Sequence, residues 1–121
     1  MKIFLVFILG LCSYFLGFSQ GFNFTREDSL RGSITKERAW WDLTFYDLDI
    51  EVEPSKKFIA GSVAIHYKVI NAHQTLQIDL QVPLKILKVL QDEVELEFKK
   101  AGLNVYYVTL KKPQEPGTTQ S

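Results

Sequence analysis

Apolar and polar residues alternate along much of the chain, a pattern typical of β-strands with one buried and one solvated face. In Thr44–Val52, apolar residues alternate with Asp47, Asp49 and Glu51, and the alternation resumes over Phe58–Val69. Between them, Glu53–Lys56 contains proline and serine, which favour turns. These stretches predict a long β-hairpin. Gly61, inside the second strand, predicts a bulge or a close backbone approach.

Further short strands are predicted in the second half of the chain. Thr75–Gln81 alternates, with Gln77 and Asp79 expected on the outward face, and Pro83 then interrupts the ladder. From residue 84 to 89 the apolar phase switches at Ile86-Leu87, as a bulge would cause. Residues 93–98 alternate again after a turn. Asn104–Leu110 is apolar on both faces, which predicts a central strand.

The fold class is therefore predicted as all-β, an antiparallel β-sandwich or a saddle-like, partial sheet. No helix is strongly signalled after the N-terminal segment. Residues 38–110 are expected to form the β domain. Residues 21–37 are polar and aperiodic, which predicts an extended lead-in, and residues 111–121 contain two prolines and a glycine, which predicts a linker or disordered end.

Residues 1–20 have the pattern of a signal peptide. Lys2 precedes the uncharged apolar run Ile3–Phe18, and Ser19-Gln20 end it. This run is shorter than the ~20 residues of a typical spanning helix. The prediction is a secreted or periplasmic protein with a signal helix and no stable membrane association after cleavage; an uncleaved membrane anchor is the alternative. A lipoprotein signal is disfavoured because Leu11 precedes Cys12.

Charge and cysteine content narrow the functional classes. The chain has 14 basic and 14 acidic residues, which provides no basic field for nucleic acid, so no nucleic-acid partner is expected. The sole cysteine, Cys12, lies in the signal segment. No disulfide is therefore expected in the exported part of about 100 residues, whose stability must come from a single hydrophobic core.

The ionisable residues do not form a recognisable catalytic constellation. A zinc-peptidase helix places two histidines four residues apart, whereas His66 is expected in a strand and His73 in a turn. The predicted roles are an exposed strand histidine and a turn histidine, with metal ligation as the alternative. The acidic rows, Asp47/Asp49/Glu51 and Glu93/Glu95/Glu97, are predicted to be solvated strand faces. Catalytic, cofactor-binding and metal residues are accordingly predicted to be none.

The aromatic residues suggest packing or an interaction platform. The set comprises Trp40, Trp41, Phe45, Tyr46, Tyr67, Tyr106 and Tyr107. Core or domain-interface packing is favoured over a sugar- or peptide-binding platform. Because Trp40 and Trp41 are adjacent, one of them is expected to cover a sheet edge or contact a partner domain.

The segment Arg38–Pro54, continued by Lys57–Ile65, resembles the opening of the N-terminal domain of aminopeptidase N-like zinc metallopeptidases of peptidase family M1. Its Tyr46-Asp47-Leu48-Asp49 strand, proline- and lysine-containing turn and Ile59-Ala60-Gly61 strand match that domain in order. Thr75–Leu80 and Leu84–Ile86 are similar to its next strands. The Trp40-Trp41-Asp42 version and the signal ending resemble secreted members from Bacteroidetes-type bacteria.

The resemblance implies a non-catalytic β domain that shapes the substrate cleft and docks a metallopeptidase catalytic domain, in cis if the full gene exists. Zinc is expected in that catalytic domain, whose histidine-glutamate-x-x-histidine helix and Gly-x-Met-Glu-Asn loop are missing from this sequence. The chain alone is therefore expected not to be an enzyme and to hold no cofactor. The alternative is a free-standing secreted β-sandwich that binds a peptide, a glycan or a partner protein.

The resemblance also implies that the chain stops before the family's first domain is complete. A sheet that ends part-way has an unpaired edge, which is a template for association. A chain beginning at Gly21 is accordingly expected to be marginally stable or prone to aggregation.

Overall fold

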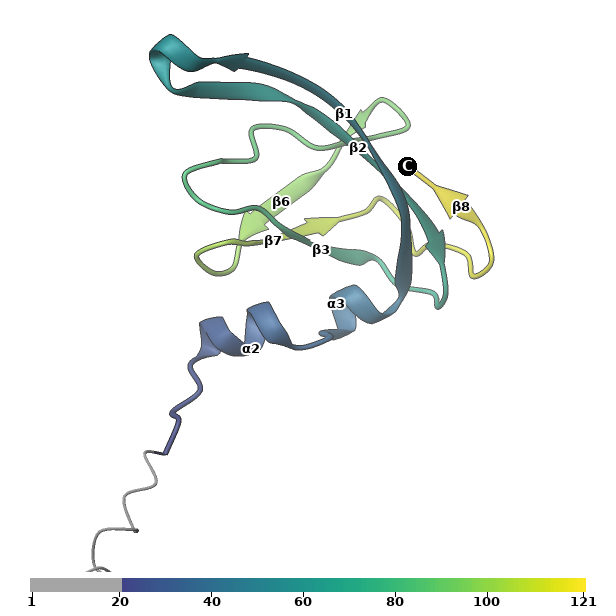
Figure 1. The fold of residues 1–121 in the computed structure, drawn as a ribbon. Coiled ribbons are helices and arrows are strands. Elements are labelled where there is room, and N and C mark those ends of the chain that lie inside the picture. The colour runs from purple at the N-terminus through teal and green to yellow at the C-terminus, as the bar shows by residue number, and fades with distance from the viewer. Residues whose placement is uncertain (1–20) are drawn as a thin grey trace, which may run out of the picture.

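The computed structural model describes residues 21–121, so the predicted signal helix lies outside the described residues. These residues form two three-stranded sheets, ordered β1-β2-β8 and β3-β7-β6, and a small β4-β5 hairpin (Figure 1). Every strand pair is antiparallel, which confirms the all-β, antiparallel class. The strands are β1 Trp41–Glu53, β2 Phe58–Val69, β3 Thr75–Asp79, β4 Leu90–Gln91, β5 Val94–Glu95, β6 Glu97–Lys100, β7 Val105–Thr109 and β8 Thr119–Gln120.

The predicted long hairpin is present as β1 and β2. Its turn contains the short 3-10 helix η1, Pro54–Lys56, and Lys57 closes the turn with a φ of 51°. Strand β1 begins earlier than predicted because a bulge between Leu43 and Phe45 restores the pairing with β2. At Gly61 the prediction of a close backbone approach is confirmed, since an added Cβ would lie 2.0 Å from the carbonyl oxygen of Asp49.

The second sheet confirms one strand position and corrects another. Strand β7 is central between β3 and β6, as its two apolar faces predicted. No strand covers residues 84–89, however, so the predicted strand with a bulge at Ile86-Leu87 is wrong. The backbone after Pro83 is irregular, so alternating apolar residues in this stretch do not indicate a β-strand. The predicted strand over 93–98 is likewise divided, since β5 and β6 are separated at Leu96. Glu93 belongs to the turn before β5, because Asp92 and Glu93 both adopt positive φ and turn β4 into β5.

One hydrophobic core joins the two sheets. Its buried members are Trp40, Tyr67, Val69, Leu76, Leu96, Val108 and Leu110. Trp40 precedes β1, is 2% exposed and donates its indole N–H to the carbonyl of Thr75 at 2.7 Å. Trp41 is half-buried against the same core and donates to the carbonyl of Glu37. Both indoles therefore bury their rings while satisfying their N–H groups.

The predicted extended lead-in, residues 21–37, is wrong, because this segment contains helix α2, Arg26–Gly32, and the start of α3, Lys36–Ala39. A capping box begins α2: Thr25 accepts from the Asp28 amide, and Asp28 accepts from the Thr25 amide. This Thr-x-x-Asp spacing was a readable signal. No helix within residues 21–121 has the length and apolar character needed to cross a membrane.

The helices change the environment of β3. Gln77, predicted to face outward, is 2% exposed. Its amide accepts from the Thr35 hydroxyl at 2.7 Å and donates to Asp79 at 3.0 Å. Arg38 of α3 also pairs with Asp79. The alternation of β3 was therefore correct, but the polar face is covered because α2 and α3 pack on it (Figure 1).

The predicted linker or disordered end, residues 111–121, is also wrong. Thr119 and Gln120 form β8, which pairs with Lys68 and Tyr67 of β2. Gln114 is buried, and its backbone amide donates to the carbonyl of His73 at 2.9 Å. Polar composition was misleading here because backbone hydrogen bonds, rather than apolar burial, fix the segment.

The buried phenol of Tyr67 makes the stability of the fold depend on pH. Burial is the main cause that raises the pKa of its phenol, the hydrogen bond from Gln91 at 3.2 Å opposes the shift, and the charge of Asp92 adds to it. A raised folded-state pKa means that stability is fully present below pH 10, the ordinary value, and is lost as pH rises above it.

We therefore expect the urea midpoint to fall between pH 8 and pH 11 by more in the unaltered chain than in Tyr67→Phe, which cannot ionise. Urea unfolding followed by circular dichroism at both pH values measures this. An equal fall in the two proteins would show that Tyr67 does not carry the alkaline sensitivity.

Candidate interaction surface

The distal half of the β1–β2 hairpin has an exposed apolar face. In the β1–β2 register, Leu48 is opposite Val63 and Val52 is opposite Ile59, with Ile50 opposite Gly61. The five apolar residues are between 44% and 61% exposed. They lie on the same face of the hairpin as Tyr67 and Val69, which are buried in the core. The hairpin therefore continues the core face out into solvent.

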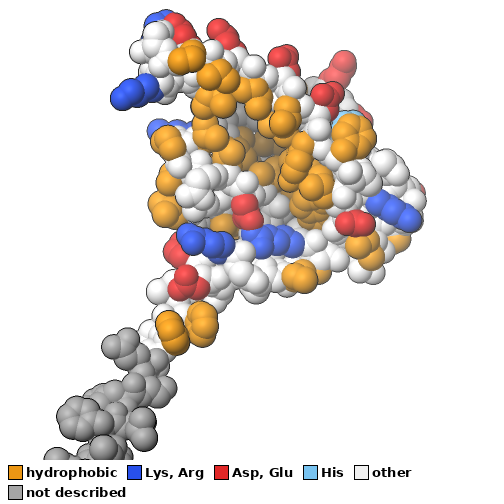
Figure 2. Space-filling view, viewed as in Figure 1, with side chains coloured by type: hydrophobic (Ala, Val, Ile, Leu, Met, Phe, Trp, Pro, Cys, Tyr) orange, Lys and Arg blue, Asp and Glu red, His pale blue; other side chains and the backbone are white. Residues whose placement is uncertain are grey.

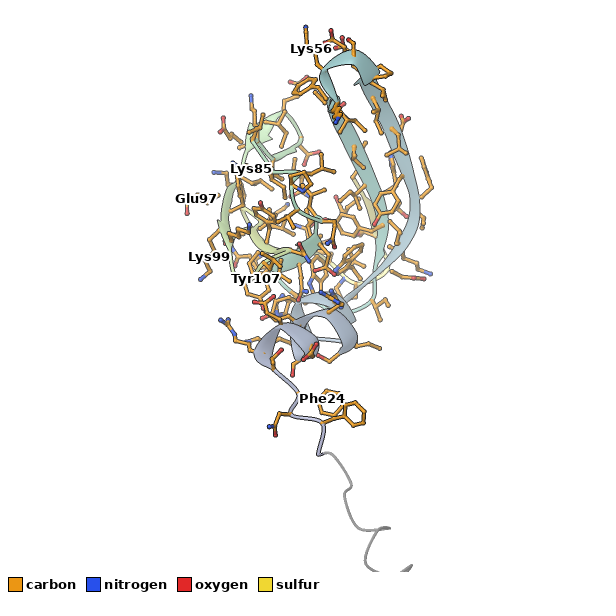
Figure 3. All side chains as sticks on the ribbon, turned by 60° about the vertical axis from the view of Figure 1, so that its left-hand side comes forward. Phe24, Lys56, Lys85, Glu97, Lys99 and Tyr107 are labelled. Carbon is orange, nitrogen blue, oxygen red and sulfur yellow. The ribbon has the colours of Figure 1, made fainter. Side chains whose placement is uncertain are left out.

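Strand length explains this exposure. Strand β1 has 13 residues and spans about 43 Å, whereas β3 and β7, with 5 residues each, span about 16 Å. The second sheet can cover only the base of the hairpin. In Figure 3, Lys56 marks the free tip, far from Tyr107 in the second sheet and from the helices. The ranges expected from the sequence, Thr44–Val52 against Thr75–Gln81 and Asn104–Leu110, differ much less in length, so the uncovered face was not predicted.

The loop region opposite the hairpin adds further exposed apolar side chains. They are Leu84, Leu87, Leu90 and Val94. Figure 2 shows apolar side chains gathered below the hairpin around a hollow between it and the rest of the molecule. We call the set Leu48, Ile50, Val52, Ile59 and Val63 the hairpin apolar face. Its extent exceeds the scattered single apolar residues that are ordinary on protein surfaces.

The opposite face of the hairpin is acidic. Asp47, Asp49 and Glu51 are exposed and lie opposite Ala64, Ser62 and Ala60. The prediction of a solvated strand face is confirmed for this row. The second predicted row is not a row: Glu93 lies in a turn, Glu95 in β5 and Glu97 in β6. All three carboxylates are exposed, and Glu95 lies 3.9 Å from Lys88. They are therefore separate surface charges.

The two histidines have separate packing roles. His66 stacks on Phe45, with ring centroids 4.0 Å apart, on the acidic face of the hairpin. His73 stacks on Trp40 at 5.8 Å, and its Nδ1 lies 3.0 Å from the Thr75 amide. Within the described part of the chain, no group of His, Cys, Asp and Glu is arranged to hold a metal ion. The predicted positions are confirmed, since His66 lies in β2 and His73 between strands, but His66 is half-buried and not exposed as predicted.

The aromatic residues do not gather into one platform. Trp40 and Trp41 both pack edge-to-face on Tyr67, with centroids 5.8 and 5.6 Å apart, and Tyr106 is buried near Phe98. The favoured core-packing role is confirmed for these side chains. Phe45 and Tyr46 are exposed, and because they are adjacent in β1 they point to opposite faces.

Comparisons of the chain with protein-family models, with curated proteins and with solved structures gave no match.

Proposed function

We propose that this chain is the non-catalytic N-terminal β domain, or a fragment of it, of a secreted aminopeptidase N-like zinc metallopeptidase. In this role it docks the catalytic domain and shapes the substrate cleft. The proposed finer architecture is an antiparallel sandwich or saddle-like sheet. Zinc belongs to the catalytic domain and not to this chain. The order of the segments in Arg38–Ile65 supports this family, and the signal-like pattern of residues 1–20 supports export.

The hairpin apolar face is the observation that carries the docking role. Burying apolar surface against a partner is favourable by about 25 cal/mol per Å², so this face favours association with another domain. Its occupant in this proposal is the catalytic domain, because the residues that resemble the family's opening strands are those that form the hairpin. The acidic face remains solvated on the other side.

Two readouts test this role. A histidine-glutamate-x-x-histidine sequence encoded downstream of Ser121, in phase or after a frameshift, would support it, and a stop codon followed by an unrelated gene would contradict it. If that catalytic domain exists, calorimetry should detect its binding to this chain. Binding should weaken at least about tenfold when Leu48 and Ile50 are changed to lysine. The matched control changes Asp47 and Asp49, on the opposite face, to lysine and should bind normally.

The chain alone is expected to release no product from amino-acyl anilides and to bind no stoichiometric zinc. The physical reason is that the two histidines are committed to separate aromatic stacks, so they supply no converging ligand set. Anilide hydrolysis and zinc content by atomic emission measure this, with an authentic aminopeptidase as the positive control. Turnover by the pure chain, or a zinc-to-protein ratio near one, would overturn the expectation.

A secreted β module that binds a peptide, a glycan or a partner protein is the second candidate. The exposed ring of Phe45, stacked on the half-buried His66 with an interplanar angle of 10°, favours it, because a flat aromatic surface suits sugar rings and peptide side chains. Phe45→Ala would weaken binding in this alternative and leave catalytic-domain docking unchanged.

A further inference from the structure

Strand β2 has one edge that is unpaired over most of its length. Its other edge pairs with β1 from Phe58 to Val69. On the free side, β8 reaches only Tyr67 and Lys68, and Gly117 and Thr118 bond to Val69. Among residues 21–121, no strand pairs with residues 58–66 on this side.

The hydrogen-bonding groups on this edge can be identified from the pairing. Val69 donates to Thr118 at 2.9 Å and accepts from Gly117 at 2.8 Å, both on the β8 side. Bonding direction alternates along an antiparallel strand. The free edge therefore presents the amide and carbonyl groups of Ile59, Gly61, Val63 and Ile65. Such an edge is a template for a further strand.

The free edge of β1 differs in charge. A second copy paired along β1 would place Asp47, Asp49 and Glu51 opposite the same carboxylates, and like charges directly opposite are destabilising. The corresponding face of β2 carries Ala60, Ser62 and Ala64, which are uncharged. Charge therefore protects the edge of β1 against self-pairing and leaves the edge of β2 open to it.

Pairing of β2 with itself has one register that uses the whole free segment. Centred on Ser62, it places Ile59 opposite Ile65 and Gly61 opposite Val63, and these are the residues whose backbone groups point outward. Phe58 then lies opposite His66, and Ala60 opposite Ala64. No like charges meet, the segment ends before β8, and Ile–Ile pairs continue the apolar face.

We propose that two copies of this chain associate through the free edge of β2, from Phe58 to His66, as an antiparallel pair with the two-fold axis at Ser62. The contact is isologous, so it closes at the dimer, and the outer β1 edges carry carboxylates. This proposal is independent of the metallopeptidase role, because its contacts are the outward backbone groups of β2, whereas the side chains of Ile59 and Val63 stay on the hairpin apolar face.

Cysteine crosslinking tests the register. In a Cys12→Ser background, Ser62→Cys places two thiols at a non-hydrogen-bonded antiparallel position, where Cα atoms are about 4.5 Å apart, within disulfide range. Mild oxidation is expected to convert most of this protein to a covalent dimer on a non-reducing gel. Asp49→Cys is the matched control, since position 49 lies opposite Ser62 on β1, away from the β2–β2 contact, and this variant should run as a monomer on the same gel. Equal crosslinking of the two variants, or none in either, would overturn the proposal.

Sedimentation equilibrium of the unaltered chain provides a second readout. A dimer mass is expected, with Ser62→Lys weakening dimerisation at least about tenfold because two ammonium groups meet at the axis, and Ser62→Thr retaining it. Because Ser62 is exposed and lies opposite Asp49 within its own hairpin, the secondary structure of Ser62→Lys by circular dichroism should match that of the unaltered chain. A monomer at 100 μM, or oligomers that keep growing with concentration as β2-on-β1 stacking would give, refutes a closed dimer.

Discussion

Replacing Trp40 with alanine is expected to lower the free energy of unfolding by about 3–5 kcal/mol, the range for truncating a large buried aromatic side chain. Trp40 is 2% exposed and contacts Tyr67 and His73 through its ring. It also donates the 2.7 Å hydrogen bond to Thr75, which joins the start of β1 to β3. The substitution therefore removes both core volume and the polar link between the two sheets.

Urea unfolding measured by tryptophan fluorescence and circular dichroism checks this, with Trp41 as the remaining fluorophore. Total stabilities of small domains are roughly 5–15 kcal/mol, so the variant is expected to be largely or partly unfolded at 37 °C. Phe45→Ala is the matched control, because Phe45 is exposed on β1, the strand that follows Trp40, and should change stability by less than about 1 kcal/mol. Similar losses in the two variants would contradict the assignment of Trp40 to the core.

Gly61→Ala is expected to open the distal hairpin at a local cost of about 1–3 kcal/mol or more. The added Cβ would lie 2.0 Å from the Asp49 carbonyl oxygen and 2.8 Å from the Ile50 Cα, and both are backbone atoms of the partner strand that cannot rotate away. The φ of 157° at Gly61 is also unfavourable for an L-residue. The strands must separate at this position, because no side-chain rearrangement relieves the contact.

Amide hydrogen exchange measured by NMR distinguishes this local opening from global unfolding. The amides of Asp49, Glu51, Ala60 and Ser62 should exchange at least about tenfold faster, while those of β3 and β7 keep their protection. Ala60→Val is the control, since Ala60 points to the exposed face and a β-branched residue suits a strand. Unchanged exchange in Gly61→Ala would show that the hairpin accommodates a Cβ at this position.

The β1–β2 hairpin has two parts with different roles. Near its base, Tyr67 and Val69 belong to the core and determine whether the domain folds. From Ile65 toward the turn at Pro54–Lys56, β1 and β2 extend past the second sheet. Their apolar face and the free β2 edge are available there for partners. The expected tendency to associate then has a specific location, because of the two hairpin edges that of β2 lacks flanking carboxylates.

Local chemistry made much of the fold predictable. Glu53–Lys56 fixed the turn, the alternation of Phe58–Val69 fixed its strand to the residue, and the two apolar faces of Asn104–Leu110 predicted that β7 is central. The helix α2 was missed although Thr25 and Asp28 form its capping box, because a short capped helix has too few turns to show an apolar periodicity.

Residues 84–89 show where periodicity has no meaning. Their apolar side chains line an irregular segment, and alternation describes a face only when the backbone is pleated. The family resemblance and the role inferred from it stay predictions, which the downstream sequence and the docking and zinc experiments address.

By itself, the sequence determined the extent of β2 and where the main hairpin turns, and it marked Gly61 as a position of bulging or close backbone approach, since these depend on alternation and turn chemistry along the chain. Only the tertiary structure decided which apolar residues are buried. Leu48 and Val69 have the same place in the alternating pattern, yet Val69 is in the core and Leu48 is exposed. Burial depends on how far the second sheet extends, and Gln77 is buried for the converse reason, because the helices cover its polar face.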